Sequence, residues 1–165
     1  MEAQARRVLA ALKNHDVSVE TKSSEIAELK STIKHQVVPD AAINSLIEVV
    51  KSSMTSQHSA LVGQGLSTLG HLLKRLSLQS GDHLTHHAPR ILPLILEALG
   101  DRKDRHRALA MQCLTDVWLA VPQDVERMVR ESTMSSKNPR TKESSMQWLA
   151  TVCTKILHPS YLWRC

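Results

Sequence analysis

The sequence predicts an all-α protein, an α-solenoid of about four antiparallel helix pairs. Apolar residues recur at every third or fourth position through most of the 165 residues, which is the spacing of helices that bury one face. Hydrophobic residues make up 42% of the chain and are almost all aliphatic, with no Phe, one Tyr and three Trp. Polar turn signals separate the periodic stretches, and strand signals are absent. We therefore expect one domain in which helices pack on helices.

The clearest helix pair is expected between Ile91 and Val121. Two apolar stripes at helical spacing flank a break at Gly100-Asp101, where Gly100 accepts the left-handed conformation that often ends a helix. Asp101 or Asp104 can cap the second helix. Asp104 followed by Arg107 at the head of that helix resembles the HEAT-repeat signature. A single helix pair cannot bury both of its faces, so this resemblance implies further copies.

Further copies are visible when Leu66, Leu114 and Leu149 are placed in register. The three aligned segments are GLSTLGHL, CLTDVWLA and WLATVCTK, and each follows a polar turn at the same offset. In each segment another apolar residue stands three positions after the leucine, as one helical face requires. From these stripes we expect a supporting core that includes Leu69, Leu92, Leu114, Trp118 and Leu149.

The remaining elements follow from the same spacing and from end signals such as Pro near a helix start. In chain order we expect helices over residues 3–13 and 19–34, a helix opened by Pro39-Asp40, a helix holding Val62 to Leu76, a helix opened by Pro122, and a last helix from the SSKNPRT turn to about Ile156. With the central pair these make eight helices in four pairs. We assign residues 1–157 to one repeat domain and residues 158–165 to a divergent C-terminal tail.

Charge and cysteine usage narrow the possible environments. The 21 Lys and Arg against 16 Asp and Glu give a formal net charge of +5, which favours acidic partners. Cys113 and Cys153 fall on helical stripes and are expected to be buried, reduced thiols, while Cys165 is terminal. No apolar run reaches the length of a membrane span, and the first residues lack the apolar core of a signal peptide. We expect a cytoplasmic or nuclear protein without a membrane partner.

A histidine cluster and a glycine cluster are the features closest to a chemical site. His83, His86 and His87 have spacings that could bring imidazoles together around a metal, but only Asp82 could complete the set, so we interpret them as polar residues at a helix start. The glycines at 63, 65 and 70 lie in a helix, with no strand before them and no Lys-Ser after them. We interpret them as sites where helices approach closely. No nucleophile stands in a Gly-flanked strand-to-helix turn, so we predict no enzyme, no catalytic or metal site and no cofactor.

Three separated blocks resemble the N-terminal region of fungal CLASP proteins, which stabilise microtubules of the mitotic spindle. They are LAALKNHDVSVETKSSEIAELKSTIKHQVVPDAAI, SQHSALVGQGLSTLGHLLKRL and KNPRTKESSMQWL, and the similarity spans roughly residues 3–157. The resemblance implies a TOG-like domain, a paddle of HEAT repeats that engages tubulin along the edge formed by the turns inside each helix pair. A full TOG domain has six pairs, so the four predicted pairs resemble the front part of one. The implied locations are the cytoplasm, cytoskeleton and spindle, and the nucleus during mitosis.

Carried onto this sequence, the implied edge consists of four turns: Asn14 to Val19, Met54 to His58, Gly100 to Arg105 and Ser136 to Lys142. Many TOG domains place a Trp in the first turn, where this chain has Val17. The later turns carry basic residues, which suit acidic tubulin because complementary charge speeds association and fixes orientation. The candidate tubulin-binding residues are Val17, Arg102, Lys103, Arg105, Lys137, Arg140 and Lys142. Other spindle or kinetochore proteins are further candidate partners.

Two other functions remain open on the sequence alone. A HEAT-repeat scaffold or adaptor would recruit or transport partners on its helix faces, without tubulin contact. The basic turns could also contact nucleic-acid phosphates. Interspersed acidic residues and the near absence of stacking aromatics disfavour nucleic acid.

Overall fold

The computed structural model describes residues 1–79 and 81–156, and these residues form eight α-helices joined by short turns. In order they are α1 (Glu2–Lys13), α2 (Val19–His35), α3 (Asp40–Met54), α4 (Ser59–Gln79), α5 (Gly81–Ala98), α6 (Asp104–Trp118), α7 (Pro122–Ser135) and α8 (Pro139–Ile156). The prediction of an all-α chain with four sequential helix pairs is confirmed. The expected tail at 158–165 lies outside the described residues.

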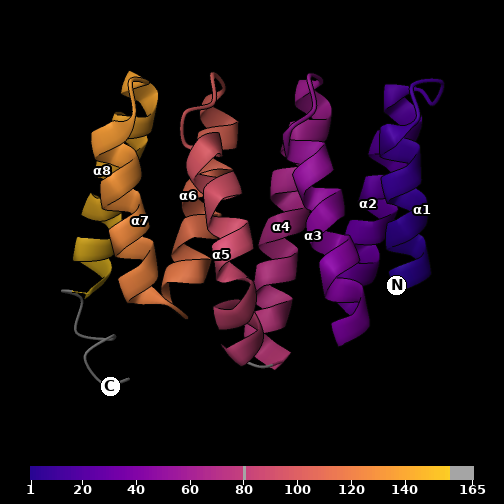
Figure 1. Cartoon of the computed structure of the whole chain (residues 1–165), viewed down its shortest axis with the longest axis horizontal. Helices are drawn as coiled ribbons and strands as arrows, with labels where there is room; N and C mark the ends of the chain where they lie inside the picture. The colour runs from indigo at the N-terminus through magenta and orange to yellow at the C-terminus, as the bar shows by residue number, and fades with distance from the viewer. Residues whose placement is uncertain (80, 157–165) are drawn as a thin grey trace.

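The helices form two layers that run along the molecule. The first helices of the pairs, α1, α3, α5 and α7, contact one another in order, and the second helices, α2, α4, α6 and α8, do the same. All four turns within pairs lie at one edge, the upper edge in Figure 1, and the connections from α2 to α3 and from α6 to α7 lie at the opposite edge. This arrangement follows because each antiparallel pair stacks on its neighbour in the same orientation.

One continuous apolar core fills the space between the layers. Leu69, Leu92 and Leu114 are no more than 1% exposed, as the sequence predicts. Trp118 is only partly buried and donates its indole N–H to Glu126 (3.0 Å) on the next helix. The prediction for Leu149 is wrong, because this side chain is 36% exposed.

The last helix is rotated by about one residue from the expected register. Trp148, not Leu149, points inward, where its ring nitrogen donates to Thr115 Oγ1 (3.1 Å) on α6. A buried indole requires such a partner, and its large ring fills the space that a leucine would leave. Met146 and Cys153 are consequently exposed, so the expectation of a buried Cys153 is also wrong. Cys113 is buried as predicted, and burial raises the pKa of its thiol to about 12.

Several helix ends differ from the sequence interpretation. Gly100 does not adopt the left-handed conformation, and within residues 1–79 and 81–156 no residue has a positive φ. The first helix of the central pair begins at Gly81, ahead of Ile91, and contains Pro89 and Pro93. Pro122 is the first residue of α7, as expected, because its missing N–H costs nothing at that position.

The glycines of α4 mark close approaches between helices, as the sequence predicts. A Cβ at Gly65 would lie 2.8 Å from the Cβ of Ser53 on α3, which is closer than packing allows. A Cβ at Gly63 would lie 3.2 Å from His106 Nε2 on α6. The lack of side chains at these positions therefore lets α4 pack tightly on both sides. None of the helices in the described part of the chain is long and apolar enough to cross a bilayer.

The core assignment predicts the effect of truncating Leu114. Leu114→Ala should lower the free energy of unfolding by about 2–5 kcal/mol, because the side chain is fully buried and leaves a cavity. Urea denaturation followed by circular dichroism measures the change. Leu78→Ala, at a side chain that is 80% exposed, is the matched control and should stay within about 0.5 kcal/mol of the wild type. Equal effects of the two substitutions would contradict the assigned core.

Candidate functional site

The turns inside the helix pairs use the same local hydrogen bond to fix their shape. In each turn a side-chain oxygen accepts the backbone N–H two residues further on, as Asn, Asp and Ser do in turns. The four bonds are Asn14 Oδ1 to Asp16 N–H (2.9 Å), Ser56 Oγ to His58 N–H (3.1 Å), Asp101 Oδ1 to Lys103 N–H (2.7 Å) and Ser136 Oγ to Asn138 N–H (3.1 Å). The backbone of the edge is therefore specified locally, turn by turn.

The turn between α5 and α6 is the most densely bonded of the four. Besides binding the Lys103 N–H, Asp101 places Oδ2 3.2 Å from His106 Nδ1. Partial burial alone would raise the pKa of Asp101, but the Lys103 N–H and the His106 ring hold it below its ordinary value. The stabilisation from ionised Asp101 is complete above the unfolded pKa of about 3.8 and is lost as the pH falls through the lowered folded pKa.

Arg107, in the first coil of α6, stabilises the same turn. Its guanidinium donates to the carbonyl oxygens of Asp101 (3.0 Å) and Arg102 (3.3 Å) and pairs with the carboxylate of Asp104. Both acidic residues of the turn are therefore bound within it. The Asp104–Arg107 spacing noted in the sequence acts structurally, by holding the turn closed.

Asn138 joins this turn to the neighbouring turn between α7 and α8. Its Nδ2 donates to Gly100 O (2.9 Å), and its Oδ1 accepts the N–H of Arg140 at the start of α8 (3.0 Å). A Cβ at Gly100 would lie 2.6 Å from both Asn138 Nδ2 and Thr141 Oγ1, so any larger residue would have to displace these two side chains. The sequence analysis missed this role of Asn138, although an Asn just ahead of a helix start is a recognised capping signal.

The predicted contact residues all lie at or beside the turn edge, and they differ in exposure. The six basic side chains are exposed, whereas Val17 in the first turn is half-buried. The six are Arg102, Lys103, Arg105, Lys137, Arg140 and Lys142. Among the residues that the structure describes, none of the six forms an ion pair. Arg140 and Lys142 stand in the first coil of α8 and not in the turn itself.

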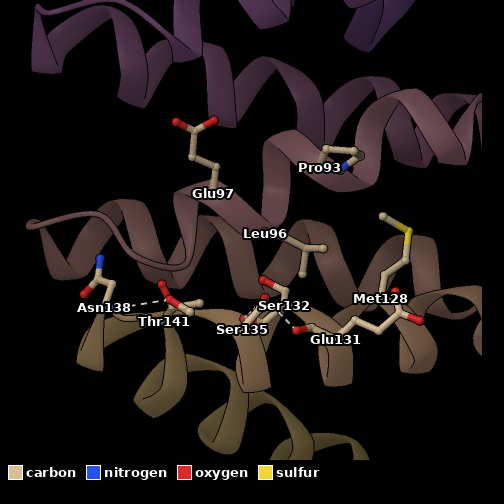
Figure 2. A pocket seen from close by; sticks show the side chains of 10 residues that line it. Pro93, Leu96, Glu97, Met128, Glu131, Ser132, Ser135, Asn138 and Thr141 are labelled. Carbon is tan, nitrogen blue, oxygen red and sulfur yellow. Dashed lines mark hydrogen bonds between the residues drawn. The ribbon is translucent and has the colours of Figure 1, made fainter.

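A groove of about 570 Å³ opens between α5 and α7 in the first-helix layer (Figure 2). One end is apolar, with Pro93, Leu96 and Met128, and the other end is polar, with Asn138 and Thr141. Glu97 and Glu131 also line it, so this groove is acidic where the turn edge is basic. The two surfaces suit partners of opposite charge.

Comparisons with known proteins agree with this architecture. A family model described as "CLASP N terminal" matches residues 1–162. The chain is 48% identical to Protein stu1 of Aspergillus fumigatus over 94% of its length, and 43% identical to Protein stu-1 of Neurospora crassa over 90%. It is 30% identical to Protein STU1 of Debaryomyces hansenii over 83%. These alignments cover 12%, 13% and 9% of the respective relatives, so the chain spans only a small part of their length. The resemblance drawn from the sequence is confirmed.

The surroundings of Gly100 and Gly70 predict opposite effects on stability when each glycine is replaced by alanine. Gly100→Ala should destabilise the fold by about 1–3 kcal/mol, because the new Cβ would displace Asn138 and Thr141. Gly70→Ala is the matched control, since its Cβ would meet only Cys113 Sγ at 3.7 Å within a helix, and it should stabilise by up to about 1 kcal/mol. Thermal denaturation of both variants measures the difference. A Gly100→Ala variant as stable as the wild type would show that the turns are not in close contact.

Proposed function

The chain belongs to the CLASP N-terminal family, and from this premise we propose its function. We propose that this domain is a tubulin- and microtubule-binding module, which helps to stabilise dynamic microtubules and supports mitotic spindle formation. Binding would occur along the turn edge. Membership in this family agrees with the prediction that the chain is not an enzyme.

The observation that carries the proposal is the row of six exposed cations at the turn edge, none of which forms an ion pair within the part of the chain that the structure describes. Asp101 and Asp104 are held by His106, the Lys103 N–H and Arg107, so they do not neutralise the basic side chains around them. Unpaired charges at one edge attract an acidic surface over long range and orient it on encounter. Tubulin, which the family resemblance implies as the partner, is acidic.

The bonded turns add a second argument, because a surface that is already ordered loses little entropy on binding. Each turn has its own side-chain to backbone bond, and Asn138 ties the third turn to the fourth. Preorganisation of this kind improves affinity without any new contact. The half-buried Val17 offers little apolar area, so we propose that the first turn contributes less than the third and fourth.

The proposed setting follows from the family. The module would act in the cytoplasm, on the cytoskeleton and spindle, and in the nucleus during mitosis. Other spindle or kinetochore proteins would be further partners.

A second candidate function is an interaction scaffold that recruits a partner without touching tubulin. The groove between α5 and α7 favours it, because its apolar end and its two glutamates suit a peptide with an apolar and a basic side chain. The two functions use different surfaces, so variants at the turn edge distinguish them.

Cosedimentation with αβ-tubulin at low and physiological salt tests the turn edge. The double variant Arg102→Ala, Lys137→Ala should weaken binding by roughly 2- to 30-fold, the sum expected for two exposed charge pairs. The loss should be larger at low salt, where charges are less screened.

The matched control removes two exposed lysines away from the edge, Lys34→Ala and Lys74→Ala, with the same change in net charge. It should bind nearly as the wild type does. Equal losses in both double variants would indicate a general charge effect. A wild-type chain that is folded but never sediments with tubulin or microtubules would reject the proposal and favour the scaffold.

A further inference from the structure

A second basic site lies in the second-helix layer, just inside the turn edge. It is a pocket of about 410 Å³ between α2, α4 and the start of α6. Three cations line it, and no carboxylate does. They are Lys30 on α2, Lys103 just before α6 and Arg105 in the first coil of α6, and the last two also belong to the turn edge. Three cations without a carboxylate give the pocket a positive charge that favours an anionic ligand.

His106 forms one wall of this pocket and is held in a fixed orientation. Its side chain is only 6% exposed, and its Nδ1 lies 3.2 Å from Asp101 Oδ2. The other ring nitrogen, Nε2, faces Gly63, where a Cβ would lie 3.2 Å away. In the described part of the chain nothing accepts a hydrogen bond from Nε2. His106 therefore contacts Asp101 through one ring nitrogen and places the other beside Gly63, a lining residue of the pocket.

The start of α4 supplies backbone donors to the same space. Ser59 and Ala60 line the pocket and belong to the first coil of the helix, whose N–H groups have no acceptor within the helix. The positive end of the helix dipole also favours an anion there. Lys30 is held over the pocket by a hydrogen bond from its Nζ to Gln64 Oε1 on α4 (3.3 Å).

We propose that this pocket binds the phosphate group of a phosphorylated serine or threonine on a partner polypeptide. A phosphate monoester carries nearly two negative charges and three acceptor oxygens, which match donors that converge from three helices. A carboxylate has one charge and two oxygens, and would leave part of this donor set unused. No Phe, Tyr or Trp lines the pocket to stack a base, so a polypeptide is favoured over nucleic acid. This site goes beyond the turn edge, since Lys30 and Gly63 belong to helices of the second layer.

A titration of the whole chain, followed by amide NMR, tests the site. The probe is the peptide Gly-Gly-phosphoserine-Gly-Gly, with the unphosphorylated and the glutamate versions as references, all at constant ionic strength. The phosphopeptide should shift the amide signals of Gly63, Ser67 and His106, and bind more tightly than either reference. Lys30→Gln should weaken its binding by roughly tenfold, the loss expected for one charge-assisted hydrogen bond.

Lys34→Gln is the matched control, one helical turn further along α2 and outside the pocket, and should leave binding unchanged. Gly63→Ala is a second pocket variant, which should reduce binding by narrowing the space in front of His106. Arg102→Ala with Lys137→Ala should leave phosphopeptide binding intact, while Lys30→Gln should leave tubulin sedimentation intact. These variants therefore test the phosphopeptide pocket and the tubulin-binding edge independently, so one proposal can be rejected while the other stands.

Four results would overturn the proposal. The first is the absence of shifts at the pocket amides in a folded chain, and the second is equal loss in the Lys30 and Lys34 variants. The third is inorganic phosphate or the glutamate peptide binding as tightly as the phosphopeptide, which would indicate a site without preference for a phosphorylated chain. The fourth is displacement of the peptide by a much lower concentration of oligouridine RNA, which would indicate a nucleic-acid site.

Discussion

Each helix pair of this chain buries its apolar faces only by packing on the next pair, and this constraint places every turn within a pair at one edge (Figure 1). The turns are then free of core packing and can carry polar residues. Their shape is fixed by side-chain to backbone bonds, such as that from the Lys103 N–H to Asp101, and not by burial. The edge is consequently both ordered and exposed, which is what a binding surface on rigid elements requires.

At the third turn the acidic side chains stabilise the turn, whereas most of the basic side chains remain exposed for binding. The carboxylates of Asp101 and Asp104 hold the third turn: Asp101 accepts the Lys103 N–H and contacts His106, and Asp104 pairs with Arg107. The cations around them have no such task. His106 has a part in both regions, because one ring nitrogen meets Asp101 in the turn and the other faces the basic pocket behind it. The turn edge and the pocket are therefore neighbouring surfaces that share Lys103 and Arg105.

The sequence was sufficient to predict the helices, but it did not predict which face of the last helix, α8, is buried. Leu66 and Leu114 are buried where helices pack on both sides, so the apolar stripe alone determined their position. At α8 the stripe was misleading, because the hydrogen bond from Trp148 to Thr115 rotates the helix and exposes Leu149. Local signals cannot reveal a bond between residues 33 positions apart.

The candidate edge was predictable for a related reason. Turn positions follow from helix spacing, and exposed basic residues can be read directly from the sequence. The bond between Asn138 and Gly100, 38 positions apart, could not be read in this way, and neither could the meeting of Lys30 with Arg105 in one pocket. Both depend on how neighbouring pairs stack. Gly100 was correctly identified as special, but the cause is close approach and not a left-handed backbone.

Hydrogen exchange of the chain with and without αβ-tubulin tests the central claim most directly. The account predicts slower exchange on binding at residues 99–103 and 136–138, a weaker effect at 14–18 and 55–58, and no change at the connections between pairs, 36–39 and 119–121. Protection confined to α5 and α7 around their groove, or centred on the connections between pairs, would contradict the assignment of the turn edge as the contact surface.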